Sequence, residues 1–204
     1  MEDGKIYNRD VPLIKDYLNT KGEAALLDVA SFVLTTIQQP LSSCGRQMDE
    51  IRQRGSEATA LWGFKRSGYE YVRNNLTALY DSLLSSDDVY SKMETFLEVP
   101  GLGLPKASFV LQCCGYDTAC MDVHNLRRYG LPVSMTKVGK VKPETRMKKI
   151  KAYVNYCQIM GTEAHWNGWC DYTAGNKMNK SLPTGDMVSA YHVECITGEK
   201  HGVP

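Results

Sequence analysis

The chain has 204 residues, of which 43% are hydrophobic and 23% are charged, the ordinary composition of a soluble globular protein with a sizeable core. Its formal net charge of +1 excludes a molecule that is basic or acidic throughout, so any surface that attracts nucleic acid must be local. No apolar run has the length of a membrane span, and the polar residues 1–10 lack the apolar segment of a signal peptide. We therefore expect a cytoplasmic protein without membrane contact.

The seven cysteines include no Cys-x-x-Cys pair, although Cys113 and Cys114 are adjacent within an apolar run. Zinc and iron–sulfur sites usually bring closely paired ligands. This pattern favours reduced, buried thiols, and we expect neither a metal nor a cofactor.

Helical periodicity dominates the chain and predicts an all-α fold of about eight to ten helices. Residues 22–39 are apolar around most of a helix, which predicts a central helix that ends before Pro40. Ser56 is a good N-cap for a helix that would partly bury Trp62 and Phe64. Further helices are predicted over 71–84, 88–98, 105–114, 122–129, 144–160, 165–175 and 182–196, with a loop at 131–143.

A Pro-Gly-Leu-Gly turn at residues 100–103 separates two of these helices. Glycine permits backbone angles that are closed to other residues and lets the backbone approach another molecule closely. Lys106 and the backbone amides after Gly103 then lie at a helix N-terminus, where a phosphate is readily bound. The turn by itself is equally typical of a simple tight connection between two helices.

The turn and a second motif together point to a family. The segment VPGLGLPKASFVL followed by CMDVHNLRR resembles the helix-hairpin-helix DNA glycosylase (HhH-GPD) superfamily, which includes endonuclease-III-like and 8-oxoguanine glycosylases. Pro100, Gly101 and Gly103 match the hairpin of that family, and residues 122–124 match its Asp-Val-His motif. The resemblance covers roughly residues 22–130 and is closest to a small, mostly bacteriophage-encoded branch, whose members would work in the host cytoplasm.

Two other stretches fit the same family. FVLTTIQQPLS resembles its first core helix, which ends in a glutamine that enters the duplex; Gln38 is the matching residue and Gln39 its neighbour. GFKRSGYEYVRNNL resembles a Gly-aromatic-x3-Lys-Ala-x2-Ile helix, but Gly68 stands where the Lys-Ala pair would begin. The four-cysteine cluster of the endonuclease-III-like enzymes is absent from the sequence.

The resemblance implies a monomer that binds double-stranded DNA, flips a modified or damaged base and cleaves its N-glycosidic bond. Asp122 would stabilise the positive charge that develops on the sugar, and it also suits a helix N-cap. The residues expected to contact DNA are Gln38, Gln39, Gly101, Leu102, Gly103, Pro105, His124, Asn125, Arg127 and Arg128.

Lys106 departs from the family pattern. Bifunctional members carry a nucleophilic lysine two residues after the last hairpin glycine, and here Pro105 occupies that position. One residue along a helix is a rotation of about 100°. Lys106 is therefore either the nucleophile of an abasic-site lyase or a contact to phosphate, and the sequence leaves both open.

Other features also leave alternatives open. The dense basic run over 137–151 fits either a DNA-facing patch or a solvated helix face. Trp166 and Trp169 share a helical face and fit core packing better than stacking on a base. Two rival functions remain: a phage transferase that modifies a 5-hydroxymethyluracil-derived base on the same scaffold, and a non-catalytic DNA-binding protein.

The expected organisation is a single glycosylase-like unit over 1–204. It would consist of two lobes, the first formed by 40–130 with the hairpin at 99–114, and the second by 1–39 plus 131–204.

Overall fold

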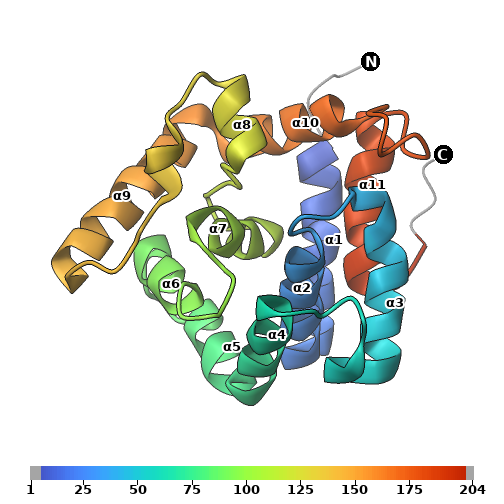
Figure 1. The fold of residues 1–204 in the computed structure, drawn as a ribbon, viewed down its shortest axis with the longest axis horizontal. Coiled ribbons are helices and arrows are strands. Elements are labelled where there is room, and N and C mark those ends of the chain that lie inside the picture. The colour runs from blue at the N-terminus through green and yellow to red at the C-terminus, as the bar shows by residue number, and fades with distance from the viewer. Residues whose placement is uncertain (1–5, 201–204) are drawn as a thin grey trace.

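A computed structural model describes residues 6–200, and within that range the protein is all-helical, with eleven α-helices and no strand (Figure 1). The helices are α1 (Ile6–Lys21), α2 (Glu23–Thr35), α3 (Cys44–Arg54), α4 (Phe64–Asn74), α5 (Leu76–Leu84), α6 (Val89–Phe96), α7 (Leu104–Cys113), α8 (Val123–Arg128), α9 (Pro143–Met160), α10 (Thr162–Thr173) and α11 (Gly185–Thr197). The all-α prediction is confirmed, and the number of helices exceeds the predicted eight to ten. Sequence reasoning missed two helices, α1 and α3. Val11, Ile14 and Leu18 of α1 are buried along one face, and the mainly polar α3 buries Cys44, Met48 and Ile51.

Helix α2 is the central helix, as its apolar composition predicted. It packs against α1, α3, α4, α5, α7 and α11. It ends at Thr35, four residues before the predicted end, because Thr35 and Thr36 donate their hydroxyls back to the carbonyls of Phe32 and Val33 at 2.7 and 2.6 Å. The carbonyl of Thr35 also accepts from the Nζ of Lys65, a fully buried lysine, at 3.4 Å.

Helices α6 and α7 are joined by the Pro-Gly-Leu-Gly turn. The amide of Leu102 donates to the carbonyl of Val99 at 3.0 Å. Gly101 has a φ of +87°, and a Cβ at this position would lie 2.6 Å from the ring of Phe64. Gly103 is the N-cap of α7. A helix, a tight glycine turn and a second helix are therefore present where the sequence predicted them.

Helix α4 approaches this turn closely through Gly68. A Cβ added at Gly68 would lie 2.5 Å from the carbonyl oxygen of Pro100 and 3.1 Å from a methyl group of Leu34. A longer side chain at this position, such as lysine, would displace the hairpin. The glycine at this point is thus explained by contact between backbones.

Replacing Gly68 by Ala should therefore destabilise the protein by about 1–3 kcal/mol through overpacking. Alanine normally stabilises a helix interior relative to glycine by about 1 kcal/mol, so the expected sign is opposite to that of helix propensity. Urea unfolding would measure the change, with Ser67→Ala on the exposed neighbour as the control, expected within about 0.5 kcal/mol of the parent. A stabilised Gly68→Ala protein would contradict the close approach.

The segment before α4 differs from the prediction. Residues Gly55–Glu57 form a single 3-10 turn, and Ser56 caps no α-helix. Trp62 and Phe64 are 44% and 38% exposed, so the expectation that they are partly buried is wrong. Their rings meet edge to face at 5.7 Å and lie beside the hairpin, because Phe64 packs over Gly101.

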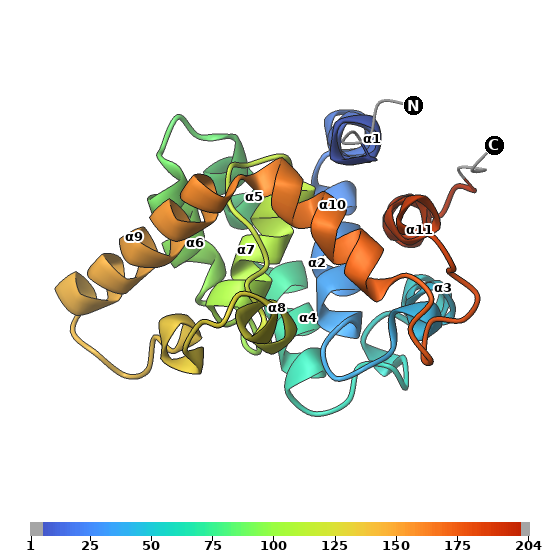
Figure 2. The same cartoon turned by 90° about the horizontal axis from the view of Figure 1, so that it is seen from above.

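Helices from the two segments that were expected to form separate lobes pack against each other. Helix α9 packs on α6, and α3 packs on α11. Both views place α9 at the end of the molecule away from α11 (Figures 1 and 2).

The predicted loop over 131–143 is present, with a 3-10 turn at Val133–Thr136. None of the helices in the described range is long and apolar enough to cross a membrane. All seven cysteines are free, and six of them are buried.

Candidate active site

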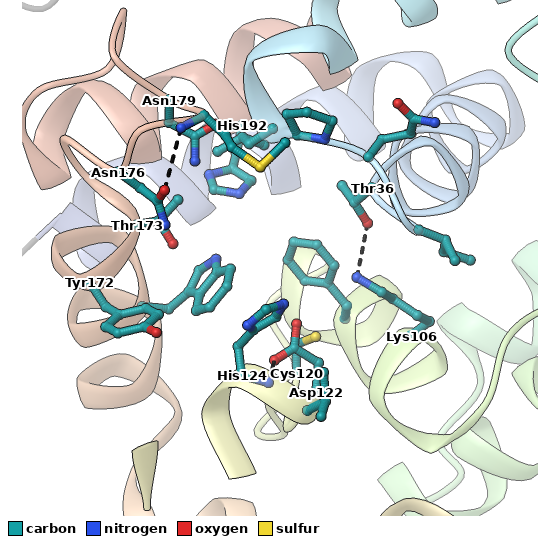
Figure 3. Close-up of a pocket in the computed structure, with 18 of the residues that line it drawn as sticks. Thr36, Lys106, Cys120, Asp122, His124, Tyr172, Thr173, Asn176, Asn179 and His192 are labelled. Atoms are coloured by element: carbon teal, nitrogen blue, oxygen red, sulfur yellow. Dashed lines mark hydrogen bonds between the residues drawn. The ribbon is translucent and has the colours of Figure 1, made fainter. Parts of the chain in front are cut away.

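A cavity of about 500 Å³ lies among the loop after α2, one face of α7, the start of α8, helix α10 with the loop that follows it, and α11 (Figure 3). This volume is in the range of sites that enclose small organic ligands. It contains both residues that the sequence analysis selected as catalytic, Lys106 and Asp122.

Lys106 lies in the first turn of α7 and lines the cavity. Its Nζ donates to the Oγ1 of Thr36 at 3.0 Å and lies 5.4 Å from the ring centroid of Phe109. Pro105 does not belong to the cavity lining. Lys106, one helix position after Pro105, is therefore the residue of this pair that faces the cavity.

Asp122 is the N-cap of α8. Its Oδ1 accepts from the amides of His124 at 3.0 Å and of Asn125 at 3.1 Å. The N-cap that the sequence predicted is confirmed, and the same carboxyl group lines the cavity. In Figure 3, Lys106 and Asp122 lie on one side of the cavity, Tyr172 and Thr173 lie on the opposite side, and His124 lies between them.

Aromatic side chains form much of the opposite wall. Trp169 lies 5.9 Å from Tyr172 and 6.3 Å from His124, measured between ring centroids. Trp166 is 3% exposed and donates its indole N–H to the Oγ of Ser189 at 2.8 Å. Trp166 is thus packed in the core as expected, while its neighbour Trp169 is only partly buried, and both line the cavity.

Gln38 and Gln39 line the cavity from the loop after α2. Gln38 is exposed and has a φ of +55°, the only positive φ at a non-glycine residue in the part of the chain that the structure describes. Such a conformation costs of order 1–3 kcal/mol and is concentrated at functional sites.

The other predicted DNA contacts are distributed around the cavity mouth and the core. Arg127 and Arg128 are exposed on α8, and the Arg128 guanidinium lies 5.4 Å from the ring of Tyr129. Asn125 is 1% exposed and donates to the carbonyl of Cys120 at 2.8 Å, so it packs inside the protein. Leu102 is also buried, which leaves the backbone and the two glycines as the accessible part of the hairpin.

The basic run over 137–151 is partly used within the protein. Arg146 pairs with Glu98 at 2.6 Å, which ties α9 to the end of α6. Lys149 donates to the carbonyls of Lys137 and Val138 at 3.0 and 3.1 Å, which holds the preceding loop against α9. The exposed lysines of the run are Lys137, Lys140, Lys142, Lys148 and Lys151.

Five buried polar residues of the cavity were missed by sequence reasoning: Gln112, His165, Thr173, Asn179 and His192. They come from α7, α10, α11 and the loop between α10 and α11, and none belongs to a local motif. The only sequence signal near them was the Trp166–Trp169 pair on α10.

The two buried histidines are neutral at physiological pH. Burial lowers the pKa of His165, whose Nε2 lies 3.0 Å from the carbonyl oxygen of Cys120. Burial also lowers the pKa of His192 from 6.5 to about 4, and its Nδ1 lies 2.7 Å from the carbonyl oxygen of Val188. A neutral imidazole bonded to a carbonyl must donate through that nitrogen, so Nε2 of His192 carries a lone pair.

We expect His192 to make the protein sensitive to acid. The unfolded chain takes up a proton at His192 as the pH falls through 6.5, whereas the folded protein resists protonation down to a pH of about 4. Stability should therefore be lost over this window, by about 2–4 kcal/mol in total. Urea unfolding at several pH values would measure the loss. In His192→Phe it should be smaller by that amount, and an identical pH dependence in both proteins would refute the assignment.

Comparison of the chain with models of known protein families, with curated proteins and with solved structures found no match.

Proposed function

We propose that the protein is a helix-hairpin-helix DNA glycosylase that draws a base from duplex DNA into the cavity and cleaves its N-glycosidic bond. One observation carries the proposal. Lys106 behind the hairpin, Asp122 at the start of α8 and the glutamines after α2 line the same aromatic-walled cavity, although they come from distant parts of the chain.

The geometry suits the chemistry of glycosidic cleavage. As the bond from the sugar to the base breaks, positive charge builds up on the sugar and the electron pair leaves with the base, which takes a proton. A carboxylate fixed beside the sugar stabilises that charge. Hydrogen bonds from two backbone amides to its Oδ1 fix the carboxylate of Asp122. The attacking group is either water or the amine of Lys106, which Thr36 holds at the cavity wall.

The surface around the cavity mouth supports contact with DNA. The hairpin presents exposed Gly101 and Gly103 at the N-terminus of α7, where backbone amides favour a phosphate. Trp62 and Phe64 form an exposed aromatic pair beside it, and apolar side chains of this kind can enter an opened base step. Gln39 lines both the cavity and a second hollow that contains Trp62, and Gln38 lines the cavity beside it, so these side chains are placed to fill the space of a departed base.

Incubation with duplex DNA that carries uracil, 5-hydroxymethyluracil or 8-oxoguanine tests the proposal. Mass spectrometry of both the released bases and the digested strand gives the readout. Free base would support glycosidic cleavage. An altered nucleoside still in the strand would assign base modification instead, and DNA binding without either product would assign a non-catalytic DNA-binding protein.

A further inference from the structure

Three polar side chains of the cavity are almost completely buried and lack partners for part of their hydrogen-bonding capacity. Gln112, Thr173 and His192 are 2%, 5% and 2% exposed. Within the described residues, the Nε2 of Gln112 and the Oγ1 of Thr173 have no hydrogen-bond partner. A buried polar group without a partner costs about 1–3 kcal/mol, so the two unpartnered atoms of Gln112 and Thr173, with the Nε2 of His192 in the same cavity, indicate that a ligand completes them.

We propose that Gln112, Thr173 and His192 recognise the hydrogen-bonding edge of a pyrimidine base. The inference rests on the proposed function and names the class of base that enters the cavity.

Gln112 supplies a donor whose orientation is fixed. Its Oε1 accepts from the amide of Cys120 at 3.1 Å, so exchanging the oxygen and nitrogen of the side chain would set two N–H groups against each other. The Nε2 is therefore the group that remains for a ligand. Its N–H requires an acceptor such as a carbonyl oxygen or an unprotonated ring nitrogen.

His192 supplies an acceptor. Because its Nδ1–H donates to the carbonyl of Val188, the lone pair of Nε2 is left for a ligand donor. Figure 3 shows the His192 ring directed into the cavity. The rings of Phe109 and Trp166 lie 6.0 and 5.3 Å from it, which provides apolar surface for a flat ligand.

Thr173 supplies a second donor. A hydroxyl can donate or accept, but an unsatisfied buried donor is rarer in proteins than an under-satisfied acceptor. The three side chains therefore offer two donors and one acceptor. The matching ligand edge has two acceptors and one donor, as in uracil, thymine and cytosine, whereas the Watson–Crick edge of guanine has one acceptor and two donors.

The positions of Lys106 and Asp122 fit a nucleotide whose base contacts the three polar side chains. Lys106 and Asp122 belong to a different part of the lining from Thr173, across the cavity in Figure 3. A nucleotide with its base against the three polar side chains would leave its sugar toward the charged pair. The volume of about 500 Å³ is sufficient for the base and its sugar together.

Ligand-observed NMR titration of the protein with free deoxynucleosides tests the inference without DNA. Thymidine and deoxycytidine should bind at least ten times more tightly than deoxyguanosine and deoxyadenosine. Gln112→Met and Thr173→Val, which nearly conserve volume, should each weaken thymidine binding by about 3- to 10-fold, the net effect of one neutral hydrogen bond. Thermal unfolding of each variant verifies that it is folded.

A change in the ligand provides a test that does not depend on folding. N3-methylthymidine lacks the only ring donor of thymidine and should bind wild type at least ten times more weakly than thymidine. In His192→Phe this difference should disappear. Equal binding of the two ligands to wild type, or purines favoured over pyrimidines, would overturn the inference.

The experiments can reject the pyrimidine site and the glycosylase function independently of each other. Nucleoside binding as predicted, with no base released from any duplex, would retain the pyrimidine site and reject the glycosylase. Release of purine bases from DNA would retain the glycosylase and reject the pyrimidine site. An absence of nucleoside binding at millimolar concentrations would overturn the inference, because water would then suffice to satisfy the three side chains.

Discussion

Replacement of Asp122 by Asn should lower the rate of base release from duplex DNA by about 10²- to 10³-fold, the usual effect of removing one electrostatic contact to a transition state. The fold should be unaffected, because the amide oxygen of Asn accepts from the amides of His124 and Asn125 as Asp122 does now. The variant thus removes the charge and keeps the cap. Single-turnover measurement of released base would determine the loss.

Asp122→Ala is the matched control, since it removes both the charge and the cap. It should lose the same activity and also about 1 kcal/mol of stability. Should Asp122→Asn release base at the wild-type rate, the catalytic role of this carboxyl group would be rejected, and the N-cap role would be sufficient to explain the residue.

Borohydride reduction on duplex DNA with an abasic site should trap wild-type protein covalently, and Lys106→Arg should form no adduct. A guanidinium keeps the positive charge but does not deprotonate in proteins, so it cannot form the imine that borohydride reduces. Thr36→Val keeps the amine and removes the acceptor that holds Nζ at 3.0 Å. It should still form the adduct, at a lower rate.

The same experiment separates the two roles of Lys106. If wild type forms no adduct, Lys106 is not a nucleophile, and a phosphate contact predicts that Lys106→Ala reduces the slope of log K against log salt by about 0.9. If Lys106→Arg is still trapped, another amine attacks the sugar. A trapped wild type and an untrapped Lys106→Arg would assign Lys106 as the lyase nucleophile.

The sequence by itself determined the features that depend on neighbouring residues. An apolar run predicted the central helix, and Pro100, Gly101 and Gly103 predicted the turn between α6 and α7. Asp122 before Val-His-Asn predicted an N-cap, which two amide hydrogen bonds confirm. Each of these signals arises from local backbone geometry, so a single stretch of sequence contains the whole of it.

Only the tertiary structure decided which side chains share the cavity. Lys106 lines the cavity because Thr36, at the end of a different helix, accepts its hydrogen bond. Gln112, Thr173 and His192 come together from three helices, and each looks like an ordinary helical residue in the sequence.

The tertiary structure also decided details that local patterns predicted wrongly. Trp62 and Phe64 have apolar side chains and were expected to be partly buried, yet both are exposed, and Phe64 lies against Gly101 of the hairpin. Gly68 has no room for a side chain, because the carbonyl oxygen of Pro100 occupies the space that a Cβ would take. Burial and facing depend on contacts between residues far apart in the chain, and the periodicity of one helix carries no information about its neighbours.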